Sequence, residues 1–174
     1  MAHHVMVDLE TLGTRAGCKI ISIGAVVFSV ADGVSETHQF NSLVNRALQP
    51  PCLWEDPDTV AWWKRQSKEA QDRIFNNPYR APAMVDVLRK FTEWLGRGAI
   101  VWGNGADFDN PILQAAYVAC GMRQPWGNWD GRCYRTLKDL RPAIKLVRTG
   151  VHHDALDDAI SQADHAVRIL RAIA

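Results

Sequence analysis

Two carboxylates, Asp8 and Glu10, close the short run HHVMVDLET near the start of the chain. The hydrophobic residues before them predict a buried strand. Because side chains alternate faces along a strand, Asp8 and Glu10 lie on one face and Leu9 on the other. Two like charges that close repel each other unless a cation lies between them or one stays protonated. A solvated strand end is the simpler interpretation, and a cation site requires further carboxylates from elsewhere in the chain.

A third carboxylate, Asp109, follows a second hydrophobic run. The segment AIVWGN predicts a short buried strand, a turn containing glycine follows it, and FDNPIL then begins a helix. Phe108 precedes Asp109 directly. An acid at a helix start is also favoured as a cap and by the helix dipole. Asp109 by itself is therefore compatible with either a structural or a catalytic role.

The segment HHDALDDA supplies a histidine and a fourth carboxylate. His153 precedes Asp158 by five residues. If a helix begins at Asp154, Asp158 lies just over one turn into it, and His153 lies on the incoming loop. The helix dipole favours acids in a first turn, which accounts for the acids but not for a histidine at this offset.

Together these segments resemble the DEDD superfamily of 3′-to-5′ exonucleases, in the subclass marked by histidine. DLET matches the first motif of that family, D-x-E-T, FDNPIL matches the second, and HDALDDA matches the third, H-x-A-L-x-D-A. His152 and Asp157 are also five residues apart, but only the frame of His153 places Ala155 and Leu156 where the pattern has them. Together with TVAWWKRQSKEA after the third expected strand, these motifs look like the branch of phage and bacterial exonucleases described as exodeoxyribonuclease VIII-like or mycobacterial exoribonuclease-like.

The resemblance implies hydrolysis of phosphodiester bonds from the 3′ end of single-stranded RNA or DNA, or of 3′ overhangs, with release of nucleoside 5′-monophosphates. It also implies two divalent cations, Mg²⁺ or Mn²⁺, which prefer oxygen ligands. Asp8 would bridge both cations, Glu10 and Asp158 would hold the one that activates water, and Asp109 would assist through a water molecule. His153 would be the general base rather than a ligand. RNA and DNA both remain candidate substrates, because discrimination between them depends on how the protein contacts the 2′-hydroxyl.

Substrate contacts are expected from four further residues. By the same resemblance, Thr11 and Leu12 meet the terminal nucleotide. Trp62 and Phe108 could stack on bases, since stacking suits single strands of any sequence. The alternative for Trp62 and its neighbour Trp63 is packing in the core. Because adjacent helical positions do not share a face, one of the two tryptophans is expected to pack and the other to be free.

Two other classes of function compete with the exonuclease. An RNase H-like endonuclease could use the same fold and metals, but it leaves the spacing of His153 and Asp158 unexplained. A catalytically idle nucleic-acid-binding module could keep the fold, but the presence of all five site residues argues against it. End-labelled substrates and a test of metal dependence would separate the three.

The elements that must position these residues are of α/β type. Strands alternate with amphipathic helices, and the first three strands are expected to form an antiparallel meander. The resemblance implies an RNase H-like mixed sheet, with three antiparallel strands followed by parallel strands, flanked by helices. We expect one exonuclease domain over residues 1–174. The expected strands are 4–9, 18–30, about 35–44 and 99–104, and the expected helices run from Asp58 or Thr59 to about 75, over 82–96, over 109–120 and onward from Asp154.

Composition narrows the class of protein. The 174 residues are 47% hydrophobic and 22% charged with a net charge of +1, which is ordinary for a globular domain. The four cysteines are widely spaced without a C-x-x-C pair, which favours reduced thiols over a disulfide framework or a zinc site. No apolar run has membrane-spanning length and no signal peptide is visible. A cytoplasmic protein without membrane contact is therefore expected.

Seven tryptophans in one domain of this size are difficult to bury together. Trp54, Trp126 and Trp129 stand in segments rich in proline and glycine, where exposed aromatic side chains commonly mark an interface. The family resemblance also suggests dimers. We therefore expect a homodimer, and the alternative is that some of these tryptophans line the nucleic-acid groove.

Overall fold

The strands form a single mixed sheet across residues 3–75 and 81–174, which are the residues that the computed structural model describes. The order in the sheet is β3-β2-β1-β4-β5. β1, β2 and β3 pair antiparallel, whereas β4 and β5 extend the sheet from β1 in parallel. The strand bounds are β1 His3–Thr11, β2 Ile20–Ser29, β3 Gly33–Leu43, β4 Ala99–Gly103 and β5 Gly131–Cys133. The predicted meander and the mixed sheet are confirmed.

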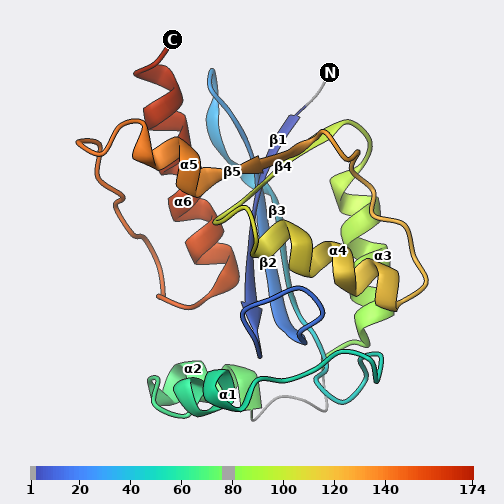
Figure 1. Cartoon of the computed structure of the whole chain (residues 1–174). Coiled ribbons are helices and arrows are strands. Elements are labelled where there is room, and N and C mark those ends of the chain that lie inside the picture. Colours follow the sequence, from blue (N-terminus) through green and yellow to red (C-terminus); the bar gives the residue numbers. More distant parts are fainter. Residues whose placement is uncertain (1–2, 76–80) are drawn as a thin grey trace.

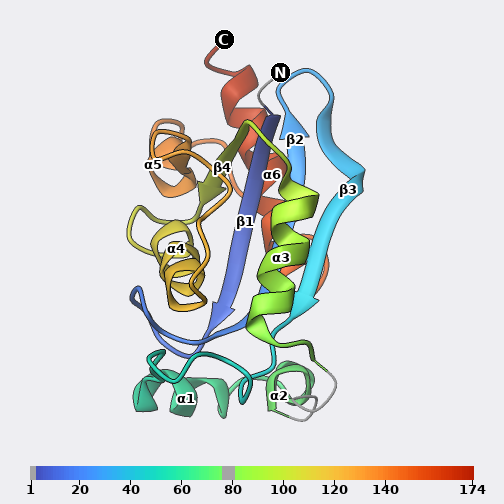
Figure 2. The same cartoon turned by 90° about the vertical axis from the view of Figure 1, so that its right-hand side faces the viewer.

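Helices cover both faces of this sheet and one end of it (Figures 1 and 2). α5 and α6 lie on one face, α3 and α4 lie on the other, and α1 and α2 lie across the end where β1 finishes. No helix within the described ranges is long and apolar enough to cross a membrane. The helix bounds are α1 Pro57–Trp63, α2 Lys68–Phe75, α3 Met84–Leu95, α4 Asp109–Ala119, α5 Tyr134–Asp139 and α6 Ala155–Arg171.

Alternation along β1 divides its side chains between two hydrophobic cores. Val5, Val7 and Leu9 pack in the core on the side of α3 and α4. Met6 packs in the second core, together with alanines of α6. Asp8 continues the face of Met6, so the predicted separation of Leu9 from the two carboxylates is confirmed and the carboxylates face α6.

The helix expected from Asp58 or Thr59 to about residue 75 is wrong as a single helix. α1 is capped by Asp56, whose side chain accepts a hydrogen bond from the Asp58 N–H, and it ends at Trp63. The amide of Gln71 donates to the backbone oxygens of Lys64 at 3.0 Å and Gln66 at 2.8 Å. A side chain therefore satisfies carbonyls that a continuous helix would use, and the chain starts again as α2. The segment NNPYRAP, residues 76–82, predicts a break before the next helix, and residues 76–80 of it lie outside the described residues.

Gly24 allows the first turn of α6 to lie directly against the sheet. It pairs with Asp8 across β1 and β2. A Cβ atom at this position would lie 2.1 Å from the backbone carbonyl carbon of Ala155 and 2.2 Å from the nitrogen of Leu156. Since these are backbone atoms, a side chain on residue 24 could be accommodated only by moving the start of α6.

Gly24→Ala is expected to destabilise the fold and displace α6. Overpacking of this kind costs about 1–3 kcal/mol, or roughly 2–12 °C in Tm for a chain of this length. Thermal denaturation measures the loss. Ser22→Ala, two residues earlier on the same strand, adds no atom and should leave the Tm within about 2 °C of wild type. A G24A protein with wild-type Tm would show that α6 is not held this close to β2.

Candidate active site

Asp8, Glu10 and Asp158 converge at the end of β1. β1 carries the first two, and Asp154 caps α6 by accepting hydrogen bonds from the N–H groups of Leu156 and Asp157, which sets Asp158 one turn into that helix. One carboxylate oxygen from each of Asp8, Glu10 and Asp158 lies within 4.8 Å of the others. Oxygens at this spacing, on buried or half-buried side chains, form a candidate metal site.

Asp109 lies beside this group but is held by the backbone. It is 1% exposed at the start of α4. One oxygen accepts the N–H of Leu9 at 3.1 Å and the other accepts the N–H of Asn104 at 2.6 Å. A Cβ atom on Gly103 would lie 2.9 Å from the Asp109 Cβ, so glycine makes room for this side chain. The structure thus places Asp109 next to Asp8 but outside the closest trio of carboxylates.

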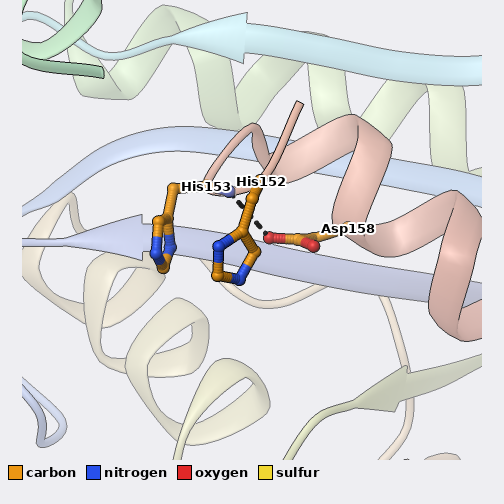
Figure 3. Close-up of side chains that lie close together, drawn as sticks. All are labelled: His152, His153 and Asp158. Carbon is orange, nitrogen blue, oxygen red and sulfur yellow. Dashed lines mark hydrogen bonds between the residues drawn. The ribbon is translucent and has the colours of Figure 1, made fainter. Parts of the chain in front are cut away.

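His153 enters the site from the loop before α6 (Figure 3). Its φ of 66° is the only positive value at a residue other than glycine among the described residues. This left-handed conformation costs energy at most side chains and is commoner at histidine than at bulky residues. It directs the His153 N–H to Asp158 Oδ2 at 3.2 Å. The imidazole packs edge-on against the Trp62 ring, with centroids 5.0 Å apart.

A pocket of about 600 Å³ joins these side chains. Trp62 is 36% exposed, whereas Trp63 is 1% exposed and donates its Nε1 hydrogen to the backbone oxygen of Thr11 at 2.8 Å. The expectation that one tryptophan packs and the other is free is therefore confirmed. The lining includes four of the five expected catalytic residues, Asp8, Glu10, His153 and Asp158, and three of the expected substrate contacts, Thr11, Trp62 and Phe108.

Leu12 does not line the pocket. Its side chain is fully buried and packs with Ile21 and Trp63 in a small separate core. The pairing of β1 with β2 shifts register between Glu10 and Thr11, so the alternation along the strand does not continue to Leu12. The buried side chain of Leu12 therefore offers no surface to a substrate in this structure, and the expected contact of the Thr11–Leu12 stretch with the terminal nucleotide stays a prediction.

Burial raises the pKa values of Asp8, Glu10 and Asp109, and repulsion by neighbouring carboxylates adds to the rise at Asp8 and Glu10. Burial, then Asp109 and Glu10, raise the pKa of Asp8 well above its ordinary value, against a hydrogen bond from Gln162 that lowers it. Burial, then Asp158 and Asp109, raise the pKa of Glu10 to about 8. Burial raises the pKa of Asp109 to about 6, although its backbone hydrogen bonds lower it. Clustered, desolvated carboxylates of this kind favour a bound cation, and their hard oxygen atoms suit Mg²⁺ or Mn²⁺.

The metal-free protein should lose stability as the pH rises from 5.5 to 8. Glu10 keeps its proton in the folded state up to a pKa of about 8, whereas the unfolded chain releases it near 4.5. Deprotonation therefore favours the unfolded state across this window, by roughly 1–3 kcal/mol. Thermal denaturation in chelator should show a falling Tm for wild type and a smaller fall for E10Q. E36Q, at an exposed glutamate, should follow the wild-type profile. Equal falls in E10Q and wild type would contradict the prediction.

Three residues that the motifs did not indicate also reach the acids. The Arg148 guanidinium forms an ion pair with Asp158. Gln162 donates to Asp8 Oδ1 at 2.7 Å, and its position one helical turn after Asp158 is a signal that sequence reasoning missed. His152 stacks on His153 with ring centroids 3.8 Å apart. Arg148 and His152 lie on an irregular loop, where no periodicity indicates which way a side chain faces.

The three loop tryptophans have different environments. Trp126 is 7% exposed and packs in the core against Tyr117, which contradicts the expectation that it is hard to bury. Trp54 is 36% exposed and lies over Gly13. Trp129 is 90% exposed. None of the three lines the pocket that holds the acids, so the alternative role in the nucleic-acid groove finds no support there.

Comparisons with known proteins agree with the geometry. Residues 3–170 match the model of the 3′-5′ exoribonuclease Rv2179c-like domain. The exodeoxyribonuclease of Enterobacteria phage T4 is 28% identical over 122 residues, which cover 62% of this chain and 52% of that enzyme. The chain thus matches about half the length of its curated relative.

Solved structures share the fold at lower identity. The nuclease domain of 3′hExo, a DEDDh family member bound to rAMP, superposes with a TM-score of 0.65 at 17% identity, covering 98% of this chain and 92% of that one. Exonuclease X in complex with 5′ overhanging duplex DNA superposes with a TM-score of 0.60 at 20% identity, covering 97% and 92%. The resemblance drawn from the three motifs and the RNase H-like fold are confirmed.

Proposed function

Because the chain belongs to the family of 3′-5′ exoribonuclease Rv2179c-like domains, we propose that it hydrolyses phosphodiester bonds from the 3′ end of single-stranded RNA or DNA, or of 3′ overhangs. The products are nucleoside 5′-monophosphates. The observation that carries the proposal is the convergence of Asp8, Glu10 and Asp158 with His153 in one pocket. Both nucleic acids are retained as substrates, since the family is described as exoribonuclease and the phage relative as exodeoxyribonuclease.

Asp8, Glu10 and Asp158 would hold two divalent cations, Mg²⁺ or Mn²⁺. Bound there, the cations supply charge neutralisation at the phosphate and at the leaving 3′ oxygen, and they favour ionisation of the attacking water. Asp109 supports the site from beside Asp8. Its hydrogen bonds to the N–H groups of Leu9 and Asn104 fix the turn between β4 and α4 against the end of β1.

His153 would accept the proton of the attacking water. Burial lowers its pKa, as do the neighbouring His152 and Arg148, while Asp158 raises it. The imidazole is thus largely neutral at pH 7 and has a free nitrogen lone pair. Its backbone bond to Asp158 and its contact with Trp62 hold the ring at the pocket. A base within reach of the carboxylate cluster is the arrangement that hydrolysis by water requires.

The terminal nucleotide would lie between aromatic side chains at the pocket wall. Trp62 and Phe108 both line it, and Trp62 is 36% exposed. Stacking on such rings accepts any base. Arg65 also lines the pocket and could contact a phosphate. These contacts would admit the end of a single strand with little dependence on sequence.

Purified protein with Mn²⁺ or Mg²⁺ on matched RNA and DNA oligonucleotides tests the proposal. A 5′ label should remain on products that shorten one nucleotide at a time, and nucleoside 5′-monophosphates should accumulate. Chelator should stop the reaction. Cleavage of circular single strands would instead indicate an endonuclease, and metal-independent binding without cleavage would indicate an idle binding module. Release of the 5′ label in the first turnover would show that the enzyme degrades from the 5′ end instead.

We further propose a homodimer, supported by the exposed Trp129. This ring and Val118, which is 70% exposed, line the same pocket around the C-terminal end of α4, away from the acids. Sedimentation at micromolar protein should give twice the mass of one chain, and W129E should reduce it to one. W54E, at the other partly exposed loop tryptophan, should stay dimeric. A wild-type monomer would contradict the proposal.

A further inference from the structure

A second imidazole, that of His152, occupies the active-site pocket without a part in the proposed hydrolysis. His152 lies between the His153 ring and the Asp158 carboxylate in the view of Figure 3. One ligand atom from each of His152, His153 and Asp158 lies within 4.8 Å of the others. This set contains two nitrogens and one oxygen, whereas the trio of Asp8, Glu10 and Asp158 offers oxygen alone.

The two sets suit different metals. Mg²⁺ is a hard ion and takes oxygen ligands. Zn²⁺ binds imidazole nitrogen and carboxylate oxygen at about 2.0–2.2 Å, commonly through three protein side chains and a water. Among divalent ions, Zn²⁺ and Cu²⁺ bind nitrogen-containing sites more tightly than Mn²⁺ does. The histidine pair therefore gives this pocket a preference for Zn²⁺ and similar cations that bind nitrogen, which the carboxylates alone do not have.

The backbone of the loop is already held in place for such a site. Thr149 donates its N–H to Ser161 Oγ at 3.0 Å, Val151 donates to Asp157 Oδ2 at 2.7 Å, and His153 donates to Asp158 Oδ2 at 3.2 Å. These three bonds fix the loop along the first two turns of α6. The stacked imidazoles must rotate apart to meet one ion, and the His152 side chain is exposed and has room to do so.

The structure also shows what opposes a cation at this position. The guanidinium of Arg148 pairs with Asp158. When a cation binds, this guanidinium must turn away from Asp158 or share the carboxylate with the cation. Its side chain is 50% exposed, so a move into solvent is open to it. Replacing Arg148 should accordingly strengthen binding of a cation by His152, His153 and Asp158.

We propose that His152, His153 and Asp158 form an inhibitory site for Zn²⁺ and similar nitrogen-preferring divalent cations. The inhibitory role rests on the proposed function, because an ion held there occupies the nitrogen of His153 that would accept the proton and takes Asp158 from the Mg²⁺ set. Binding by itself needs no catalytic activity, so it can be tested separately.

Calorimetric titration of the protein with zinc sulfate, without nucleic acid, tests the binding. Wild type should bind Zn²⁺ at a site that H152N weakens at least tenfold, since even loss of a residue that only supports a ligand typically costs about 10–100-fold in affinity. R148A should bind more tightly. E10Q keeps all three ligands and should bind as wild type, as should C52S, which removes the exposed thiol. Equal affinity in H152N and wild type would overturn the site, and so would a loss in E10Q or C52S as large as in H152N.

Nuclease assays in Mg²⁺ test the inhibition. Zn²⁺ should inhibit wild type, and the concentration for half inhibition should rise at least tenfold in H152N, whose activity without Zn²⁺ stays near that of wild type. Equal sensitivity of the two proteins would overturn the inhibitory role. If neither protein cleaves nucleic acid, the proposed function fails, and the calorimetric result still decides whether the zinc site exists.

Discussion

Asp8→Asn should lower the rate of nucleotide release by about a thousandfold or more. A bound cation contributes several kcal/mol to stabilising the charge that develops at phosphorus, and each 1.4 kcal/mol is about tenfold in rate. Asp8 is the residue expected to be shared by both cations, so its loss affects both. Initial rates on a 5′-labelled oligonucleotide in Mn²⁺ measure the effect.

A thermal shift separates loss of metal from loss of structure. The metal-free D8N protein should be at least as stable as wild type, because the substitution removes a buried carboxyl group whose ionisation is opposed by burial and by Asp109 and Glu10, and an asparagine oxygen can still accept the bond from Gln162. Mn²⁺ should raise the Tm of wild type but not that of D8N. If the D8N protein keeps more than a tenth of wild-type activity, Asp8 is not one of the residues that hold the catalytic metal.

The control for this experiment is Asp107→Asn. Asp107 lies two residues before Asp109 on the same turn, but it is exposed and is not among the residues that line the pocket. D107N should therefore keep the wild-type rate and the wild-type response to Mn²⁺. A large loss in D107N would mean that the turn as a whole is sensitive, and the effect of D8N could then not be assigned to metal binding.

Local rules predicted those parts of the fold that depend on neighbouring residues. The alternation that puts Asp8 and Glu10 on one face of β1, and the start of α6 near Asp154, were both predicted. The division of the expected helix at residue 64 was not, since it depends on the Gln71 side chain turning back to two carbonyl oxygens. α5 was also missed. It is six residues long and is held by Tyr134, whose hydroxyl meets His165 Nδ1 at 2.6 Å across 31 residues.

Motifs and helical spacing predicted the part of the candidate site that lies on β1 and around the start of α6. Spacing placed Asp158 on the first turn of α6, and the same rule applied four residues further would have indicated Gln162. Arg148 could not be found in this way, because it belongs to an irregular loop and meets Asp158 only through the folded course of that loop. For Leu12, the bulge after Glu10 turns the side chain into the core, a change of direction that alternation along the strand does not predict.

His153→Asn should lower the rate by about 10²–10⁴-fold, the usual contribution of a general base. Unlike D8N, it should keep the rise in Tm with Mn²⁺, because His153 is not a proposed ligand of the carboxylate trio. His152→Asn tests the alternative in which His152 and Asp157, rather than His153 and Asp158, are the motif residues. This variant should keep most of the wild-type rate. Equal rates in H153N and wild type would exclude His153 as the base.

The pH dependence gives a second measure of the role of His153. Burial lowers the pKa of His153 below 6.5, so at saturating Mg²⁺ the wild-type rate should persist below pH 6.5 and then fall as the imidazole gains a proton. H153N should lack this fall. At limiting Mg²⁺ the acid limb should move to higher pH, because Glu10, with a pKa of about 8 in the metal-free protein, must first release its proton for a cation to bind. If the position of the acid limb does not change with Mg²⁺ concentration, proton release at Glu10 is not coupled to metal binding.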